Sequence, residues 1–440
     1  MKKSMKYLLV LIAAALTLTG CTMRTVDQMY QLPKRSEDYS NLQTVMDKAM
    51  TGLKFSAPIT GDNQQSVQMA DLDGDGAQEY LVFCKGVSEL PLRILVFDRI
   101  DGAFVHIDSI ESNGTSFDQV EYIQMDEKPG VEIVVGHQIS DQLVRSVSVY
   151  TFADGEAERL LMASYRKFLV VDMEGDGRSE LFVLHPGQSE TDNGVAELYS
   201  LSAGIMQRSN EVSMSTPADK LKRVLIGKLY DGKTAVFVAS TVGDSSLITD
   251  VFARADQKLI NVIKQEASDT GTQTLRNYYV YADDIDNDGI TELPRLVTMT
   301  PLGDTPVTEP SKLILWYALG SSGNMMDKLF TYYNAAAGWY LRIDNKLAPR
   351  ITVRQESNTF AFYLWDASCT VAEKLLTIHT LTGQNRDEQS LTDGKFVLLK
   401  TDTAVYSAVL ETIAADYGIT QESLIRSFSL IHLDWNSGEM

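Results

Sequence analysis

The chain has 440 residues, of which 44% are hydrophobic and 22% are charged. These values are typical of a folded globular protein rather than a disordered one. The formal net charge is -20, and no run of Lys and Arg follows the N-terminus, so the basic footprint that nucleic-acid binding requires is missing. A chain of this length exceeds one ordinary compact core unless it forms a barrel or an array of repeats.

The first twenty residues predict a secretory signal rather than part of the fold. Three lysines within the first six residues form a positive segment, and the apolar stretch 7–18 is too short to span a bilayer comfortably. The sequence Leu-Thr-Gly-Cys at 18–21 resembles a bacterial lipobox, which implies cleavage before Cys21 and lipid on its thiol and new amine. We therefore expect residues 1–20 to be a lipoprotein signal peptide. The mature protein would be extracytoplasmic and membrane-anchored, at the cell surface or facing the periplasm.

Residues 21–58 are predicted to form a tether and a short N-terminal helix. From Ser40, apolar side chains recur with the helical period at 42, 45, 46, 49, 50 and 53, and Ser40 or Asn41 is a suitable cap. An isolated helix of this length would be only marginally stable, so we expect it to pack on the body.

Two cysteines remain beyond Cys21, namely Cys84 and Cys369. Two cysteines cannot form a disulfide framework, and both lie in apolar, strand-like surroundings. These surroundings predict buried thiols, with a bond between the two as the alternative.

A loop followed by a strand recurs along residues 59–394. Complete acidic loops of nine residues begin at 71, 172 and 284, and degenerate copies begin at 124, 227 and 342. Each copy is followed by apolar residues, and the six starting points are 53, 48, 55, 57 and 58 residues apart. Short β-branched and aromatic runs fill each interval, with turns such as Asp101-Gly102 between them. This pattern predicts hairpins.

About four short strands in each unit of roughly fifty residues predict an all-β fold, a β-propeller of four-stranded blades preceded by the N-terminal helix. The mean interval fits about seven blades. Residues 395–440 depart from the pattern, because strand-like runs are followed by helix-like spacing without an acidic loop. They form either a modified seventh blade that closes the ring, which we favour, or a small α+β domain after six blades.

The three complete loops resemble those of FG-GAP/VCBS-type repeats, which occur in integrin alpha-chain propellers and in many bacterial surface proteins. The resemblance covers most of residues 67–350, although the Phe-Gly and Gly-Ala-Pro signatures are absent. In that family the loop binds Ca2+ through side chains at positions 1, 3, 5 and 9 and the carbonyl of position 7. The resemblance implies three ligand sets: Asp71, Asp73, Asp75 and Glu79 with the carbonyl of Ala77; Asp172, Glu174, Asp176 and Glu180 with that of Arg178; and Asp284, Asp286, Asp288 and Glu292 with that of Ile290.

Position 9 is Glu in all three loops, where the family usually has Asp, and Glu174 is likewise longer than its usual counterpart. A plain polar turn is the simpler alternative, but three copies with glycine at the same place argue against it. An EF-hand would need a twelve-residue loop between helices. We expect up to three Ca2+ ions with a structural role, since each would neutralise carboxylates that otherwise repel one another. The degenerate loops at 124 and 227 should be metal-free.

No catalytic motif is found. The five histidines are scattered without zinc-site spacing, and neither a Gly-x-Ser-x-Gly elbow nor a P-loop occurs. Carboxylate pairs for glycoside hydrolysis stay open, because they need not be close in sequence. The aromatic residues between 316 and 340 predict core packing more than a ligand surface.

These observations predict a non-enzymatic, monomeric binding or scaffold module for a surface protein or a glycan. It would be anchored in the membrane by lipid, with no nucleic-acid partner. The alternative is a cell-envelope polysaccharide hydrolase or lyase whose site lies at the mouth of the propeller channel, since propellers also host enzymes.

Overall fold

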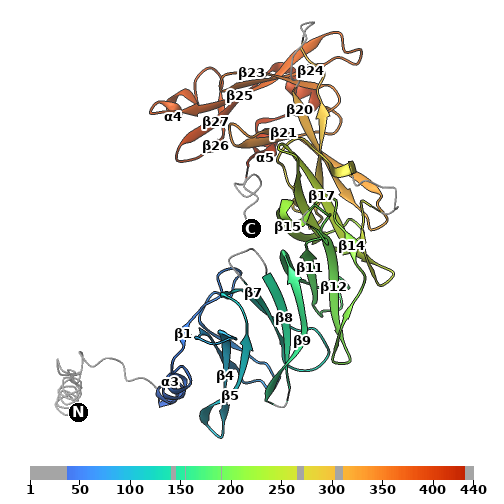
Figure 1. The fold of residues 1–440 in the computed structure, drawn as a ribbon. Helices are drawn as coiled ribbons and strands as arrows, with labels where there is room; N and C mark the ends of the chain where they lie inside the picture. The colour runs from blue at the N-terminus through green and yellow to red at the C-terminus, as the bar shows by residue number, and fades with distance from the viewer. Residues whose placement is uncertain are drawn as a thin grey trace, which may run out of the picture.

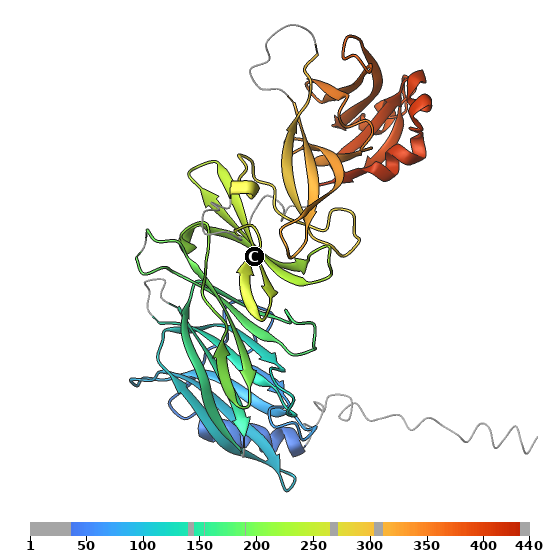
Figure 2. The same cartoon turned by 90° about the vertical axis from the view of Figure 1, so that its right-hand side faces the viewer.

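The computed structural model describes residues 37–139, 145–153, 155–189, 191–264, 272–302 and 311–431. The predicted signal peptide, the lipobox with Cys21 and most of the tether lie outside these ranges. Within them the strands form six antiparallel sheets, which follow one another in chain order from one end of the molecule to the other (Figures 1 and 2). No helix in the described ranges has the length and apolar character needed to cross a membrane.

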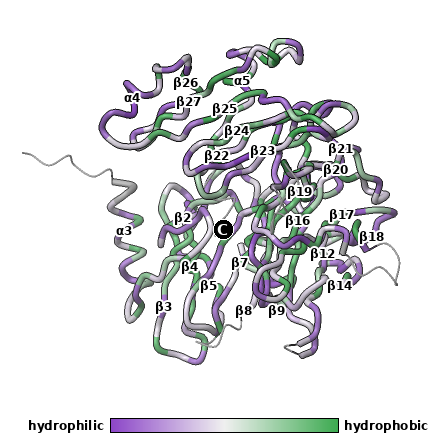
Figure 3. Tube along the Cα trace, turned by 90° about the horizontal axis from the view of Figure 1, so that it is seen from above, coloured by the Kyte–Doolittle hydropathy of each residue, from purple (hydrophilic) through white to green (hydrophobic). Residues whose placement is uncertain are grey.

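The predicted N-terminal helix is α3 (Glu37–Ala49), and it packs on the first sheet as expected. Leu42 is buried against apolar side chains of that sheet, and Figure 3 shows α3 beside the sheet with polar and apolar positions alternating along it. The cap predicted at residue 40 or 41 is wrong, because α3 already contains both. Asn41 instead accepts a hydrogen bond of 2.8 Å from the backbone N–H of Phe104.

The first four sheets are built from strands that are consecutive in the chain. The first contains β1 (Lys54–Phe55), β2 (Val67–Ala70), β3 (Glu79–Lys85), β4 (Leu92–Ile100) and β5 (Ala103–Ser112). The second contains β6 (Ser116–Ile123), β7 (Glu132–Gln138), β8 (Arg145–Ala153) and β9 (Glu156–Tyr165). The third contains β10 (Lys167–Val171), β11 (Glu180–His185), β12 (Val195–Ser202), β13 (Ile205–Arg208) and β14 (Val212–Ser213). The fourth contains β15 (Leu221–Lys228), β16 (Thr234–Val242), β17 (Ser246–Ala255) and β18 (Lys258–Asn261), with the 3-10 turns η1 (Ala218–Lys220) and η2 (Thr272–Thr274) on either side.

The last two sheets share the end of the chain. The fifth contains β19 (Glu292–Thr298), β20 (Lys312–Leu319), β21 (Met325–Asn334), β22 (Trp339–Ile343) and the late strand β28 (Phe428–Leu430). The sixth contains β23 (Ile351–Glu356), β24 (Thr359–Trp365), β25 (Ala372–Thr382), β26 (Phe396–Lys400) and β27 (Ala404–Leu410). Three short helical segments complete this part: α4 (Arg386–Gln389), η3 (Thr412–Tyr417) and α5 (Gln421–Ser427).

All six predicted loops lead into a strand, which confirms the repeat. The strands that follow them are β3, β7, β11, β16, β19 and β23. The predicted hairpin turn at Asp101-Gly102 joins β4 to β5, with φ of 51° and 82°, and two positive φ values are typical of the type I′ turns that fit twisted hairpins.

Apolar side chains join each sheet to the next. Phe83 of the first sheet meets Phe117 of the second with ring centroids 5.1 Å apart, and Trp339 of the fifth meets Phe360 of the sixth at 5.1 Å. Inner strands are covered on both faces, so they are continuous apolar runs rather than alternating ones. Trp316 and Trp339 have no exposed surface, which confirms that the aromatic residues of this region serve mainly in packing.

A closed ring of seven blades is not what the described residues show. They contain six sheets, the first and last lie at opposite ends of the molecule (Figures 1 and 2), and no strand pairing joins these two sheets. Residues 395–410 supply β26 and β27 to the sixth sheet instead of opening a seventh. The segment beyond 410 turns helical and returns to the fifth sheet as β28, so this part of the chain follows neither predicted form.

The two cysteines are free, and they lie in different surroundings. Cys84 is buried in β3, as predicted. Cys369 is exposed, so the prediction of a buried thiol is wrong there. Its segment forms a tight turn in which Asp366 accepts hydrogen bonds from the N–H groups of Thr370 and Val371.

Candidate metal centre

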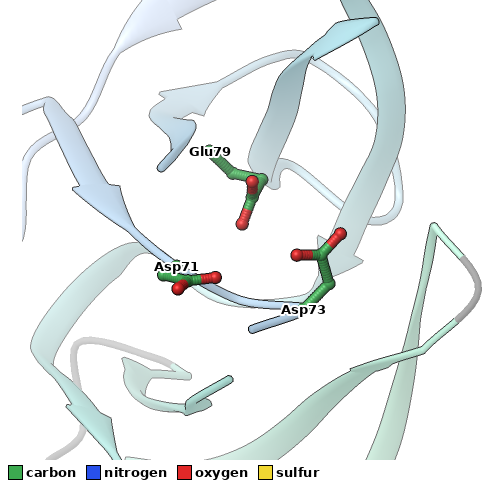
Figure 4. Close-up of side chains that lie close together, drawn as sticks. All are labelled: Asp71, Asp73 and Glu79. Atoms are coloured by element: carbon green, nitrogen blue, oxygen red, sulfur yellow. The ribbon is translucent and has the colours of Figure 1, made fainter. Parts of the chain in front are cut away.

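The first acidic loop runs from the end of β2 into β3 and brings three carboxylates together. Asp71, Asp73 and Glu79 each offer an oxygen, and these oxygens lie within 4.8 Å of one another. Figure 4 shows the three side chains pointing toward a common centre. Gly74 and Gly76 turn the chain with φ of 76° and 89°, a conformation that residues with a Cβ rarely adopt.

Backbone N–H groups hold these carboxylates in place. Both oxygens of Asp71 accept hydrogen bonds, from Gly74 at 2.8 Å and from Gly76 at 3.1 Å. Oε2 of Glu79 accepts one of 2.6 Å from Leu72. Glu79 is only 1% exposed, yet its Oε1 has no hydrogen-bond partner. An unsatisfied oxygen on a buried carboxylate is energetically costly, and here it belongs to a cluster of acidic groups.

Electrostatics at the first loop favour a bound cation. Burial raises the pKa of Glu79 to about 7, and the negative charges of Asp73 and Asp98 add to the shift. None of the largest contributions to that pKa comes from a Lys or an Arg. A cation placed among these oxygens would favour the ionised form and relieve the repulsion.

The third loop repeats this geometry, but a lysine from another strand places a positive charge among its carboxylates. Asp284, Asp286 and Glu292 form a second triad with ligand oxygens within 4.8 Å of one another. Oε2 of Glu292 accepts a 3.1 Å hydrogen bond from Ile285. The ammonium of Lys328 on β21 lies 3.6 Å from Oδ2 of Asp286 and 3.9 Å from Oε1 of Glu292. Burial raises the pKa of Glu292 to about 8, which Asp286 increases further and Lys328 opposes.

Arginines occupy the second loop. Arg254, which comes from β17 in the next sheet, forms ion pairs of 2.6 Å with Glu174 and 3.5 Å with Glu180. Arg178, predicted to offer a carbonyl, pairs through its side chain with Asp176 and with Glu127 of the second sheet. Asp172 closes the turn by accepting hydrogen bonds from Gly175 and Gly177. Among the described residues these acids do not form a close triad like the other two.

The remaining predicted ligands stabilise the loops from within. At position 5, the aspartate accepts a hydrogen bond from the N–H of position 7, at 2.7, 2.9 and 2.9 Å in the first, second and third loops. The pairs are Asp75 with Ala77, Asp176 with Arg178, and Asp288 with Ile290. Neither Asp75 nor Asp288 belongs to a triad.

One functional glutamate was missed, although the sequence contained a signal for it. Glu132 ends the degenerate loop that begins at 124, and its Oε2 accepts a 2.9 Å hydrogen bond from the backbone N–H of Met125. The corresponding bond occurs in all three complete loops. Glutamate at position 9 therefore closes the loop even where positions 1 and 5 are Gln124 and Lys128 rather than acids. A buried apolar residue at position 2 accompanies it each time: Leu72, Met125, Met173 and Ile285.

No protein-family model matches the chain, and no curated protein matches it. Similar solved structures include the rhamnogalacturonan lyase YesW, 12% identical over 73% of this chain with a TM-score of 0.29. A Bacillus licheniformis rhamnogalacturonan lyase is 12% identical over 80% of this chain and 84% of its own, with a TM-score of 0.30. Saccharomyces cerevisiae Sqt1 is 11% identical over 80% and 86%, with a TM-score of 0.30.

The chain spans 64% of the length of YesW. Similarities with such low TM-scores carry no argument about activity, so the function proposed for this chain depends on its own residues.

Proposed function

We propose that the chain is a propeller-like repeat scaffold whose first acidic loop binds Ca2+, and that it serves as a lipid-anchored binding module for a surface ligand. The observation that carries the metal site is the convergence of Asp71, Asp73 and the unpaired Oε1 of buried Glu79. Ca2+ takes six to eight oxygens in a flexible shell, and carboxylates are its usual protein ligands. Mg2+ demands a more regular octahedron, which suits a short loop less well.

The ion would join two sheets. The carbonyl of Asp71 accepts a 3.2 Å hydrogen bond from Val131 in the loop of the second sheet. A Cβ on Gly74 would lie 2.2 Å from Pro129 of that same loop. Since the two loops are in direct contact, an ion that fixes the first would also fix the packing of the first sheet on the second.

A pocket on the sixth sheet supports a glycan as the ligand. It has a volume of about 400 Å3 and is lined by residues that alternate with the core positions of β23, β24 and β25, among them Arg354, Tyr363 and His379. The guanidinium of Arg354 lies 5.9 Å from the centre of the Tyr363 ring. An aromatic ring surrounded by hydrogen-bonding groups is suited to stacking on a sugar.

The metal is tested by thermal unfolding of the full chain, made soluble by Cys21→Ser, with Ca2+ and with chelator. At a hundred times Kd, binding adds about 2.7 kcal/mol, so the melting temperature should rise by several degrees. Asp73→Asn should abolish that rise. An identical melting temperature in both buffers rejects the metal.

The ligand is tested on an array of envelope glycans, with Tyr363→Ala as the variant and Tyr279→Ala, another partly exposed tyrosine, as the control. Loss of glycan binding in Tyr363→Ala, with binding kept in Tyr279→Ala, supports the pocket on the sixth sheet as the glycan site. Shortening of a bound glycan would instead indicate the hydrolase or lyase.

A further inference from the structure

We propose that Lys328 takes the place of a metal ion at the third acidic loop, which makes this loop a latent cation site. While Lys328 is present the loop binds no divalent ion, and removing the lysine opens the site. The inference deepens the proposed metal site and rests on it only for the choice of Ca2+ as the probe.

The third loop has the same framework as the first. In each, both oxygens of the first aspartate accept backbone hydrogen bonds, and the closing glutamate accepts one from position 2. Glu292 has no exposed surface, and its Oε1 lacks a hydrogen-bond partner, just as Oε1 of Glu79 does. Oδ1 of Asp286 is also buried and unpaired. The oxygens that would hold an ion are therefore present in both loops.

A β-bulge delivers the lysine to this loop. Trp316 pairs with Leu329 and Tyr317 pairs with Asp327, which leaves Lys328 as the extra residue on β21. An extra residue in one strand bends it and redirects a side chain. Here the side chain is only 15% exposed, and its ammonium forms ion pairs with Asp286, Asp288 and Glu292.

The same bulge recurs in other sheets with a different residue. In the first sheet, Phe97 pairs with His106 and Val96 with Asp108, so that Ile107 is the extra residue. The corresponding residues in the second and sixth sheets are Leu160 and Leu375. Lysine therefore stands at a position that is otherwise apolar. A lysine at so poorly exposed a position requires paired acids, and the third loop supplies them.

An ammonium and a divalent ion cannot share this loop. Both would use the oxygens of Asp286 and Glu292, and like charges a few ångströms apart repel each other strongly where water is scarce. The first loop has Ile107 at the equivalent place, so its oxygens stay available. In the second loop, the guanidinium of Arg254 likewise supplies positive charge to the acids, through its ion pairs with Glu174 and Glu180.

The test counts Ca2+ bound per chain by equilibrium dialysis of the full chain carrying Cys21→Ser. Lys328→Ile gives the bulge of the fifth sheet the residue found at the bulge of the first sheet, and this variant should bind one ion more than the parent. Adding Glu292→Gln should remove that extra ion. The reciprocal Ile107→Lys should bind one ion fewer than the parent.

The matched control is Lys400→Met, which removes a surface lysine paired with Asp387 at 2.6 Å. It should leave the number of bound ions unchanged.

Lys328→Met keeps most of the aliphatic stem, and provides a second measurement should the isoleucine variant fold poorly. Its melting temperature should rise more on addition of Ca2+ than that of the parent. An unchanged ion count and an unchanged Ca2+ response in both lysine variants would overturn the inference. So would a parent chain that already loses an ion on Glu292→Gln. If the parent binds none and Lys328→Ile binds one, the site proposed at the first loop fails while this inference stands.

Discussion

The backbone N–H of Leu72 donates a hydrogen bond of 2.6 Å to Oε2 of Glu79, and the other oxygen of that carboxylate is left without a partner. One oxygen therefore closes the loop while its neighbour remains available to a cation. Position 9 is glutamate in all three complete loops, and this side chain is long enough to reach position 2 across the loop. The same contact in the degenerate loop of Glu132 shows that closure does not depend on a full set of metal ligands.

Substitutions of Glu79 should separate closure from metal binding. Glu79→Ala leaves the buried N–H of Leu72 unpaired, which costs about 1–3 kcal/mol. Glu79→Gln keeps an oxygen acceptor for that N–H but loses the charge, so its free energy of unfolding in chelator should match or exceed the wild-type value, while its response to Ca2+ disappears. Urea unfolding with and without Ca2+ measures both effects. A glutamine variant with an undiminished Ca2+ response would contradict the assignment.

Glu132 should make the protein less stable as the pH rises. Burial raises the pKa of Glu132 above its ordinary value of 4.5, so the folded state holds this proton more tightly than the unfolded state. The resulting stabilisation is complete below pH 4.5 and is lost as the pH rises through the raised pKa. Glu132→Gln should therefore gain stability relative to the wild type with increasing pH. Unfolding free energies compared at pH 4.5 and pH 8 test this, and a difference that shrinks with pH would contradict it.

Two glycines in the first loop should differ in their tolerance of a side chain. A Cβ at Gly74 would lie 2.2 Å from Pro129 and 2.4 Å from the backbone nitrogen of Gly130, whereas a Cβ at Gly76 would have no neighbour within 4 Å. Both have positive φ, so alanine costs roughly 1–2 kcal/mol at either position. Gly74→Ala should cost clearly more, because the second loop must move. Equal losses of unfolding free energy would show that the two loops do not press on each other.

Removing Arg254 should destabilise the second loop more than removing an exposed arginine elsewhere. Arg254→Met leaves buried Glu180 without its ion pair, and breaking one side of a buried pair costs about 3–5 kcal/mol at most. Arg295→Met is the control, since its pair with Asp327 is exposed and such pairs contribute about 0–1 kcal/mol. Thermal and urea unfolding report the difference. Similar losses in both variants would show that Arg254 is not needed to balance the loop.

Local patterns predicted the units of this fold but not their assembly. Each loop and its strand are adjacent in sequence, so alternation, glycine spacing and the apolar run after Glu79 indicated them directly. Lys328 and Arg254 approach their loops from other strands, and nothing in the spacing of the acids points to them. The favoured count of seven blades exceeds the six sheets of the described residues, a number that the alternative had given. The mean interval assumed equal units, whereas the sixth sheet includes two further strands. Whether a ring closes depends on the tilt between packed sheets, which side-chain shapes decide.

The return of β28 to the fifth sheet affects the order in which the protein can mature. β28 pairs with β22 only after the whole sixth sheet has been synthesised between them. During synthesis the first four sheets can each fold as they emerge, because their strands are neighbours in the chain. The edge of β22 stays unpaired until β28 has been synthesised, and exposed strand edges are prone to pair with other chains. β28 therefore covers the edge of β22, and a chain released before residue 428 would leave that edge unpaired.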